Sequence, residues 1–225
     1  MADVRPLRRP VAPAKPRVPN LLMRVWDAPT RLFHWAIVLL VTFSYVSVQR
    51  EWIQLHFLSG YAVLALLLFR LAWGFVGSET SRFRQFLRSP VAGLRHLAAF
   101  GTREPDTEIG HNAAGGWAVL AMLAVLFVQV GTGLFSNNDI DAQGPLAHDV
   151  SKATSNWMTG LHATSFWVVL VAYAAFKRHD LVRAMVTGKK RLPANLRQPR
   201  FASPVLAAGI LLASAGLVWG LVRFG

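Results

Sequence analysis

Histidines lie at or near the ends of long apolar segments of this sequence. His34 begins one such run, His56 begins another, and His162 and His179 flank a third. An ionisable ring is costly in lipid, so each should face the inside of a helix bundle and have a partner there. Two neutral imidazoles from facing helices can bind a haem iron from both sides. This pattern therefore favours bis-histidine haem binding over zinc, which needs three or four clustered ligands.

The positions of these histidines along the chain indicate how deep each lies in the membrane, and thus which of them can pair. Residues 49–55 form a short connection, so the two apolar segments that it joins are antiparallel neighbours. His34 and His56 then lie at opposite faces of the membrane. His162 is expected at the level of His56, and His179 at the level of His34. The sequence thus predicts an outer pair, His56 with His162, and an inner site that contains His34.

Arg70 lies fourteen residues after His56, on the same apolar segment. Fourteen residues are close to four helical turns, so the two side chains share a face and lie about 21 Å apart. The arginine either snorkels to lipid phosphate or acts as the counter-charge to a buried carboxylate near the inner face. Gly60, one turn after His56, leaves room for a flat group beside the backbone.

Composition indicates an all-α integral membrane protein. The chain has 225 residues, is 53% hydrophobic and contains no cysteine, which excludes disulfides, iron–sulfur clusters and covalently attached haem. A net charge of +13 could indicate nucleic-acid binding, but the apolar residues form blocks near the length of about 20 that spans a bilayer. We expect a four-helix haem-binding transmembrane bundle plus a fifth C-terminal transmembrane helix. The five blocks are Leu32–Val48, His56–Val76, Ala113–Phe135, Met158–Phe176 and Pro204–Val222.

The basic residues predict the orientation. Of the 24 lysines and arginines, seven lie before Leu32, five between residues 77 and 110, and eight between residues 177 and 200. By the positive-inside rule, the N-terminus is cytoplasmic and the C-terminus periplasmic. We expect residues 1–23 to be a disordered basic cytoplasmic tail, residues 24–192 the haem-binding domain, and residues 193–225 a linker with the fifth helix. The long inner loop contains VAGLRHLAAF, which predicts a short helix on the membrane surface.

The outer loop between the third and fourth segments carries the acidic residues of that face. Asp139, Asp141 and Asp149 lie there with Lys152. With His148 these carboxylates could hold a cation, but their spacing fits no metal motif. A docking surface for a partner is the preferred interpretation.

Several stretches together resemble one family, the bacterial cytochrome b561 and nickel–iron hydrogenase b-type cytochromes. They include RVWDAPTRLFHW, HFLSGYAVLALLLFRLAWGFVGS, GHNAAGG and GPLAHDVSKATSNWMTGLH, and the resemblance covers about residues 24–192. It implies a two-haem cytochrome of the bacterial inner membrane that exchanges electrons between quinone and a periplasmic c-type cytochrome or hydrogenase-like enzyme, alone or as an oxidoreductase subunit. Family members bind haem at the positions of His34, His56 and His162, and Arg70 resembles the family arginine near the inner haem.

One position departs from that family pattern. Phe176, fourteen residues after His162, stands where the family has a second histidine. His148 lies fourteen residues before His162, but the stretch DVSKATSNWMTGL between them is too polar for a spanning helix. His179 is the preferred inner ligand and His111 the alternative. A missing or five-coordinate inner haem is a third reading.

Two other functions compete with this interpretation. The first is a haem-poor membrane anchor of a redox complex, which the incomplete inner site favours. The second is a haemless proton or metal transporter, which should show broken helices and an internal repeat. Neither feature is clear in the sequence.

Overall fold

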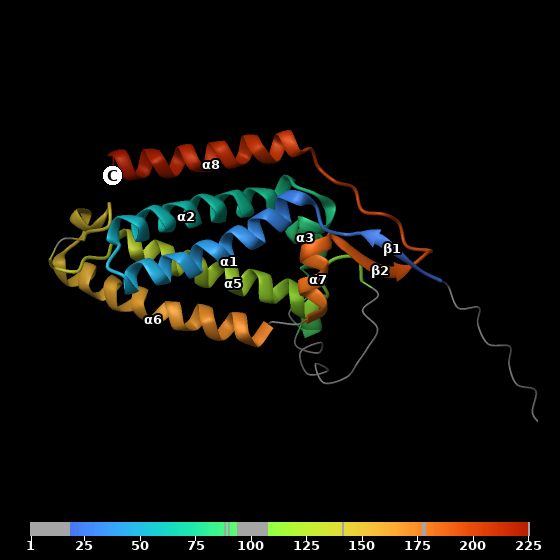
Figure 1. The fold of residues 1–225 in the computed structure, drawn as a ribbon, viewed down its shortest axis with the longest axis horizontal. Coiled ribbons are helices and arrows are strands. Elements are labelled where there is room, and N and C mark those ends of the chain that lie inside the picture. The colour runs from blue at the N-terminus through green and yellow to red at the C-terminus, as the bar shows by residue number, and fades with distance from the viewer. Residues whose placement is uncertain are drawn as a thin grey trace, which may run out of the picture.

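The computed structural model describes residues 19–87, 89, 91–93, 108–140, 142–176 and 179–224, without the side chains of residues 175, 176 and 179–181. Its main elements are long helices that lie side by side (Figure 1). Four of them alternate in direction and form a bundle, and α8 packs along the outside of α2. They are α1 (Ala28–Gln49), α2 (Ile53–Val76), α5 (Ala113–Leu134), α6 (Lys152–Phe176) and α8 (Pro204–Phe224).

Within the described residues, α1, α2, α5 and α8 are long and apolar enough to cross a membrane. The interior of the bundle is aliphatic and aromatic, with Leu67, Leu126 and Val169 among its buried residues. The predicted helical membrane bundle with a further C-terminal helix is thereby confirmed.

The fourth helix is longer than predicted. The sequence placed the start of the apolar segment at Met158 and treated the preceding residues as too polar for a spanning helix, whereas α6 begins at Lys152. Its polar first turns lie at the end of the bundle, where Ser155 Oγ donates to the Phe135 carbonyl and Thr159 Oγ1 donates to the Asn137 carbonyl. Because these side chains hydrogen-bond to the outer loop, the helix does not need apolar residues there.

The first helix also begins earlier than its apolar block. Asp27 is its N-cap, and the Asp27 side chain accepts a hydrogen bond from the Thr30 backbone N–H at 2.7 Å. Pro29 lies in the first turn, where its missing N–H costs no hydrogen bond. The helix therefore starts at Ala28, and His34 lies in its second turn.

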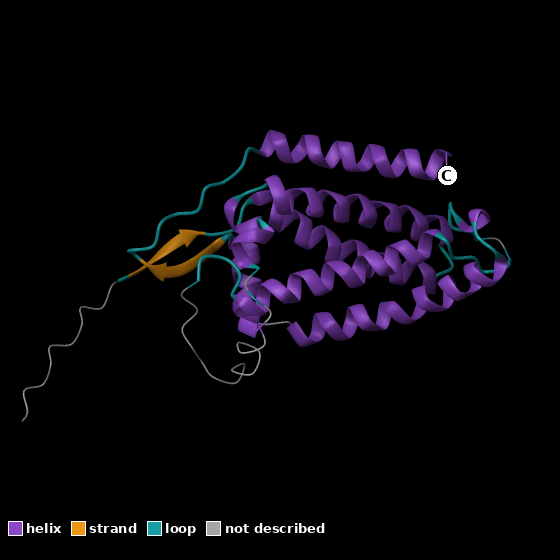
Figure 2. Ribbon diagram, turned by 180° about the vertical axis from the view of Figure 1, so that it is seen from behind, coloured by secondary structure: helices purple, strands orange, loops and turns teal. Residues whose placement is uncertain are grey.

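A two-stranded sheet, which the sequence did not predict, lies at one end of the bundle (Figure 2). We call this the inner end and the opposite one the outer end, after the predicted orientation. Strand β1 (Asn20–Arg24) pairs antiparallel with β2 (Lys189–Pro193), so residues 20–23 are ordered although the sequence suggested a disordered tail. The chain leaves β1 into Val25 and Trp26, which are buried with Leu192 and anchor the sheet. Residues 1–18 lie outside the described part.

Short elements complete the inner end: η1 (Glu79–Ser81), α3 (Phe83–Phe86) and α7 (His179–Thr187). The linker to α8 is attached there, because the Glu79 carboxylate contacts Arg197 and accepts the Arg200 backbone N–H at 3.0 Å. Of the predicted surface helix, residues 91–93 are helical and residues 94–100 lie outside the described residues.

Candidate functional site

The outer histidines face each other across the bundle. His56, from α2, and His162, from α6, have ring centroids 6.0 Å apart, with their planes at 87°. A metal–imidazole bond is about 2 Å long, so two rings bound to opposite sides of one metal ion have centres about 6 Å apart. The pair thus has the separation that a single iron between two imidazoles requires.

Each outer histidine is fixed through its Nδ1 by a helix other than its own. His56 Nδ1 donates to the Ser44 carbonyl of α1 at 3.0 Å, and His162 Nδ1 donates to the Gln129 carbonyl of α5 at 2.6 Å. Metal-binding histidines usually donate their second ring N–H to such an acceptor, which sets the tautomer and the ring orientation. Nε2 of each ring is therefore the nitrogen that could bind a metal, and on His162 this atom lies 3.3 Å from Gln129 Nε2, whose amide N–H a metal would have to replace.

Two glycines shape the space around these rings. A Cβ on Gly133 would lie 2.9 Å from His162 Cε1, so only glycine lets the ring approach the α5 backbone this closely. A Cβ on Gly60 would meet no atom within 4 Å, which leaves room beside His56 for a flat group. The Gln129 side chain adds a polar contact, since its Oε1 accepts from Ser165 Oγ at 2.5 Å.

At the inner end, the chain brings together His34 of α1, Arg70 of α2 and His111, which directly precedes α5. Arg70 is only 3% exposed, and its guanidinium lies 5.0 Å from the centre of the Phe83 ring. Among the described residues, the Nη1 atom of Arg70 has no hydrogen-bond partner. A buried guanidinium in this state is a binding site for an anion or another acceptor.

The ring of His111 is held between two aromatic side chains, with ring centroids 4.6 Å from Trp26 and 4.8 Å from Phe86. Its Nδ1 is enclosed and, within the described chain, also lacks a partner. Burial, and to a smaller extent the charges of Arg70, Lys190 and His34, lower the pKa of His111 to about 3. His111 is therefore a neutral imidazole at physiological pH.

The sequence analysis offered a buried carboxylate near Arg70 as one alternative without naming it, and Asp27 is such a carboxylate. Asp27 is 2% exposed, and its Oδ2 accepts from Trp73 Nε1 at 3.1 Å and Ser81 Oγ at 3.3 Å. Its charge acts on Arg70 without a direct ion pair between these two side chains. The signal was present in the sequence, since Asp27-Ala-Pro-Thr30 is a helix-start pattern.

Residues 25–188 match the family model described as prokaryotic cytochrome b561. The chain belongs to this family. It is a membrane b-type cytochrome that functions in electron transfer. No curated protein and no solved structure matches it. The opposed rings of His56 and His162, with Nδ1 of each donating to a backbone carbonyl, fit the b-type haem that the family implies.

His179 lies at the start of a separate short helix. α6 ends at Phe176, where the sequence analysis ended the fourth segment, and α7 begins at His179. The two helices run in different directions (Figure 1). The side chain of His179 lies outside the described residues, so its role as a ligand stays a prediction.

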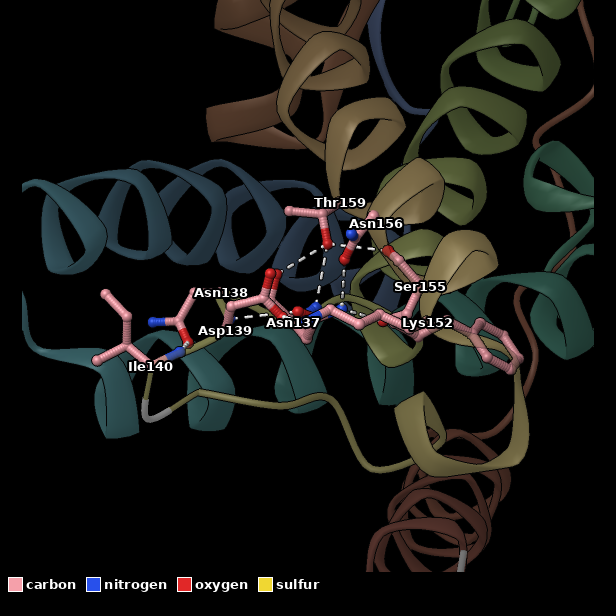
Figure 3. A network of polar contacts seen from close by, with 9 residues as sticks. Asn137, Asn138, Asp139, Ile140, Lys152, Ser155, Asn156 and Thr159 are labelled. Atoms are coloured by element: carbon pink, nitrogen blue, oxygen red, sulfur yellow. Dashed lines mark hydrogen bonds and ion pairs between the residues drawn. The ribbon is translucent and has the colours of Figure 1, made fainter.

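The outer loop of the cytochrome is a hydrogen-bonded structure next to the outer histidines (Figure 3). The Asn137 backbone N–H donates to Thr159 Oγ1 at 3.0 Å, and the Asn137 side chain donates to Ser155. Lys152 Nζ lies 3.3 Å from Asp139 Oδ1, so this carboxylate has a cationic partner. The loop is thereby held against α6, three residues from His162.

The cation site that the sequence analysis set aside in favour of a docking surface has no support among the described residues. Asp139 pairs with Lys152, and His148 Nε2 lies 3.3 Å from Asp149 Oδ1. Asp141 lies outside the described part, and within that part no group of three or more His, Cys, Asp or Glu residues could hold a metal ion. The side chain at the tip, Ile140, is instead 89% exposed, which leaves an apolar group directed outward beside the acidic residues.

Proposed function

We propose that this cytochrome carries electrons between the membrane quinone pool and a redox protein that docks at its outer loop. The partner would be a periplasmic c-type cytochrome or a hydrogenase-like enzyme. The observation that carries the proposal is the pair His56–His162, whose ring separation and Nδ1 anchors suit an axially ligated haem close to the outer face. Asp139 and the exposed Ile140 supply charge and apolar surface for docking above it.

The inner haem in this proposal is bound by His34, with His179 as the second axial ligand and His111 as the alternative. Arg70 lies about 21 Å along α2 from His56, so the two haems would occupy the two halves of the bundle. When bound, the haems supply one-electron chemistry of iron. The chain orients them through fixed imidazoles and surrounds them with apolar side chains such as Leu67 and Leu126.

The orientation across the membrane is part of the same proposal. We place the N-terminus in the cytoplasm and the C-terminus in the periplasm of a bacterial inner membrane. The strongly basic β2 and the N-terminal strand lie at one end of the bundle, and the C-terminus lies at the other (Figure 1). Reporter fusions after Arg50 or within residues 138–150 should then be periplasmic, and fusions at Arg84 or Lys190 cytoplasmic. A cytoplasmic signal from the Asp139 loop would invert this topology.

A reduced-minus-oxidised optical spectrum with a haem count on the purified full-length chain tests the proposal. We expect two low-spin haems per chain, both reducible by a quinol. One haem per chain would favour a haem-poor anchor with only the outer site. A chain that binds no haem would overturn the proposal.

A further inference from the structure

We propose that Arg70 and His111 together bind the carboxylate of a propionate of the inner haem. His111 is then a propionate contact and not an axial ligand. This inference rests on the proposed function to the extent that it requires an inner haem. It assigns a role to a histidine that the electron path itself does not use.

The first support is the unmet hydrogen-bonding capacity of Arg70. Its Nη1 is buried and lacks a partner among the described residues, while the Phe83 ring covers one face of the guanidinium. The nearest buried carboxylate, Asp27, already accepts hydrogen bonds from Thr30, Trp73 and Ser81. The guanidinium is therefore left to bind another anion, for which a carboxylate has the matching geometry.

The second support is the unmet hydrogen-bonding capacity of His111. A neutral imidazole has one N–H donor and one acceptor nitrogen. Its Nδ1 is enclosed and unpartnered within the described chain, which would be costly if the site never held a ligand. Trp26 and Phe86 hold the ring on two sides, so His111 presents this nitrogen in a fixed direction.

The third support is that the two groups border the same aromatic cluster. Phe83 lies against Arg70, Phe86 lies against His111, and the two phenyl rings are 5.9 Å apart. The charge of Arg70 also acts on His111. Two donors from neighbouring elements suit an acceptor with two oxygens. The two oxygens of one propionate carboxylate can satisfy both.

The geometry fits axial ligation by His111 less well than it fits a contact with the propionate. Within the described residues, His34 makes its ring contact with Trp35, at 5.2 Å, whereas His111 contacts Trp26 and Phe86. His34 and His111 therefore do not face each other as His56 and His162 do. A ring fixed against its aromatic neighbours is suited to donate a hydrogen bond at the haem edge.

The test uses the full-length chain loaded with haem b or with haem b dimethyl ester, whose propionates carry no charge. The wild type should bind haem b at the inner site roughly tenfold more tightly than the ester, as expected for one charge-assisted contact. Arg70→Leu and His111→Leu should each reduce this preference severalfold while the inner haem stays low-spin. His111→Gln, which keeps a donor, should restore part of it, and His148→Leu on the outer loop is the matched control.

Three results would overturn the inference. A high-spin inner haem in both His111→Leu and His111→Gln would make His111 an axial ligand. If His111→Leu kept two haems and an unchanged preference for haem b over the ester, His111 would not contact the propionate. The proposed function would still stand. A wild-type chain that holds no inner haem would overturn the inner site together with this inference.

Discussion

The outer and inner ends of the bundle position their histidines by different means. At the outer end, His56 and His162 project from two long helices, and each is fixed by a backbone carbonyl of a third or fourth helix. At the inner end, the residues around His34 come from a capped lead-in, the short helix α3 and the residues before α5. The outer site is thus built by regular helices, and the inner one by connections between them.

The two ends also differ in charge. The outer site holds neutral groups, such as the Gln129 amide and the Ser44 carbonyl, close to the histidines. The inner site contains Arg70, His111 and the carboxylate of Asp27 in an enclosed space. Enclosed charges need partners, so the inner end depends on a network of hydrogen bonds, whereas the outer end depends on helix packing.

The largest expected effect comes from breaking the outer pair. His56→Ala and His162→Ala should each remove the same haem, because each deletes one of its two axial bonds. The haem count should fall by one per chain in either variant, while the inner haem signal stays. A purified His162→Ala chain with a full complement of low-spin haem would contradict the pairing.

Asp27→Ala should break the network of the inner end. The change removes the α1 cap and leaves the buried N–H of Trp73 without an acceptor. Together these losses should lower the free energy of unfolding by about 3 kcal/mol. Thermal unfolding in detergent measures the effect, with Asp139→Ala on the exposed outer loop as the control. Equal melting temperatures for the two variants would show that the Asp27 network does not stabilise the inner end.

Gly133→Ala tests whether the outer site depends on the close approach of His162 to the α5 backbone. The new methyl group would lie 2.9 Å from His162 Cε1 and displace the ring from the Gln129 carbonyl, which should weaken the outer haem and leave the inner one unchanged. Gly131→Ala is the matched control, because a Cβ there meets no atom within 4 Å. Haem content and the midpoint potential of each haem provide the measurement. Identical potentials in both variants would argue against a close fit at Gly133.

The smallest expected effect concerns the attachment of the fifth helix at the inner end. The Arg200 backbone N–H, together with Arg197, lowers the pKa of Glu79 below its usual value. Because the pKa is lowered, the ionised Glu79 carboxylate stabilises the folded chain above about pH 4.5. This stabilisation is lost as the pH falls through the folded-state pKa. Glu79→Gln should cost no more than about 1 kcal/mol. Limited proteolysis of the linker should become faster in the variant at neutral pH and equal to wild type in acid.

The sequence allowed much of the outer site to be predicted because helical periodicity and span length control it. His56 and His162 begin apolar segments on antiparallel helices, so their common depth follows from counting residues. Gln129 was missed, although a lone amide within an apolar segment is itself a signal of a buried polar contact, and Gly133 indicated close helix packing without showing that it lies against His162. Their roles depend on which face of α5 meets α6, and counting along one helix does not show that.

The inner site was harder to predict because its parts come from connections. The sheet β1–β2 pairs residues about 170 positions apart, and α7 is a separate short helix that the sequence analysis did not predict. Hydrogen bonds from Asp27 to Trp73 and Ser81 are likewise formed between distant segments. Such contacts follow from the packing of the whole inner end.

By itself, the sequence determined that the chain forms a helical membrane bundle with histidines at two depths, because the cost of polar groups in lipid leaves few alternatives. It also contained the sequence motifs that are typical of the cytochrome b561 family. The tertiary structure alone decided which carbonyls fix His56 and His162, and that Arg70 and His111 border the same aromatic cluster with nitrogens that lack partners among the described residues. These details depend on helix rotation and on the paths of the connecting segments, which are set by packing between distant parts of the chain.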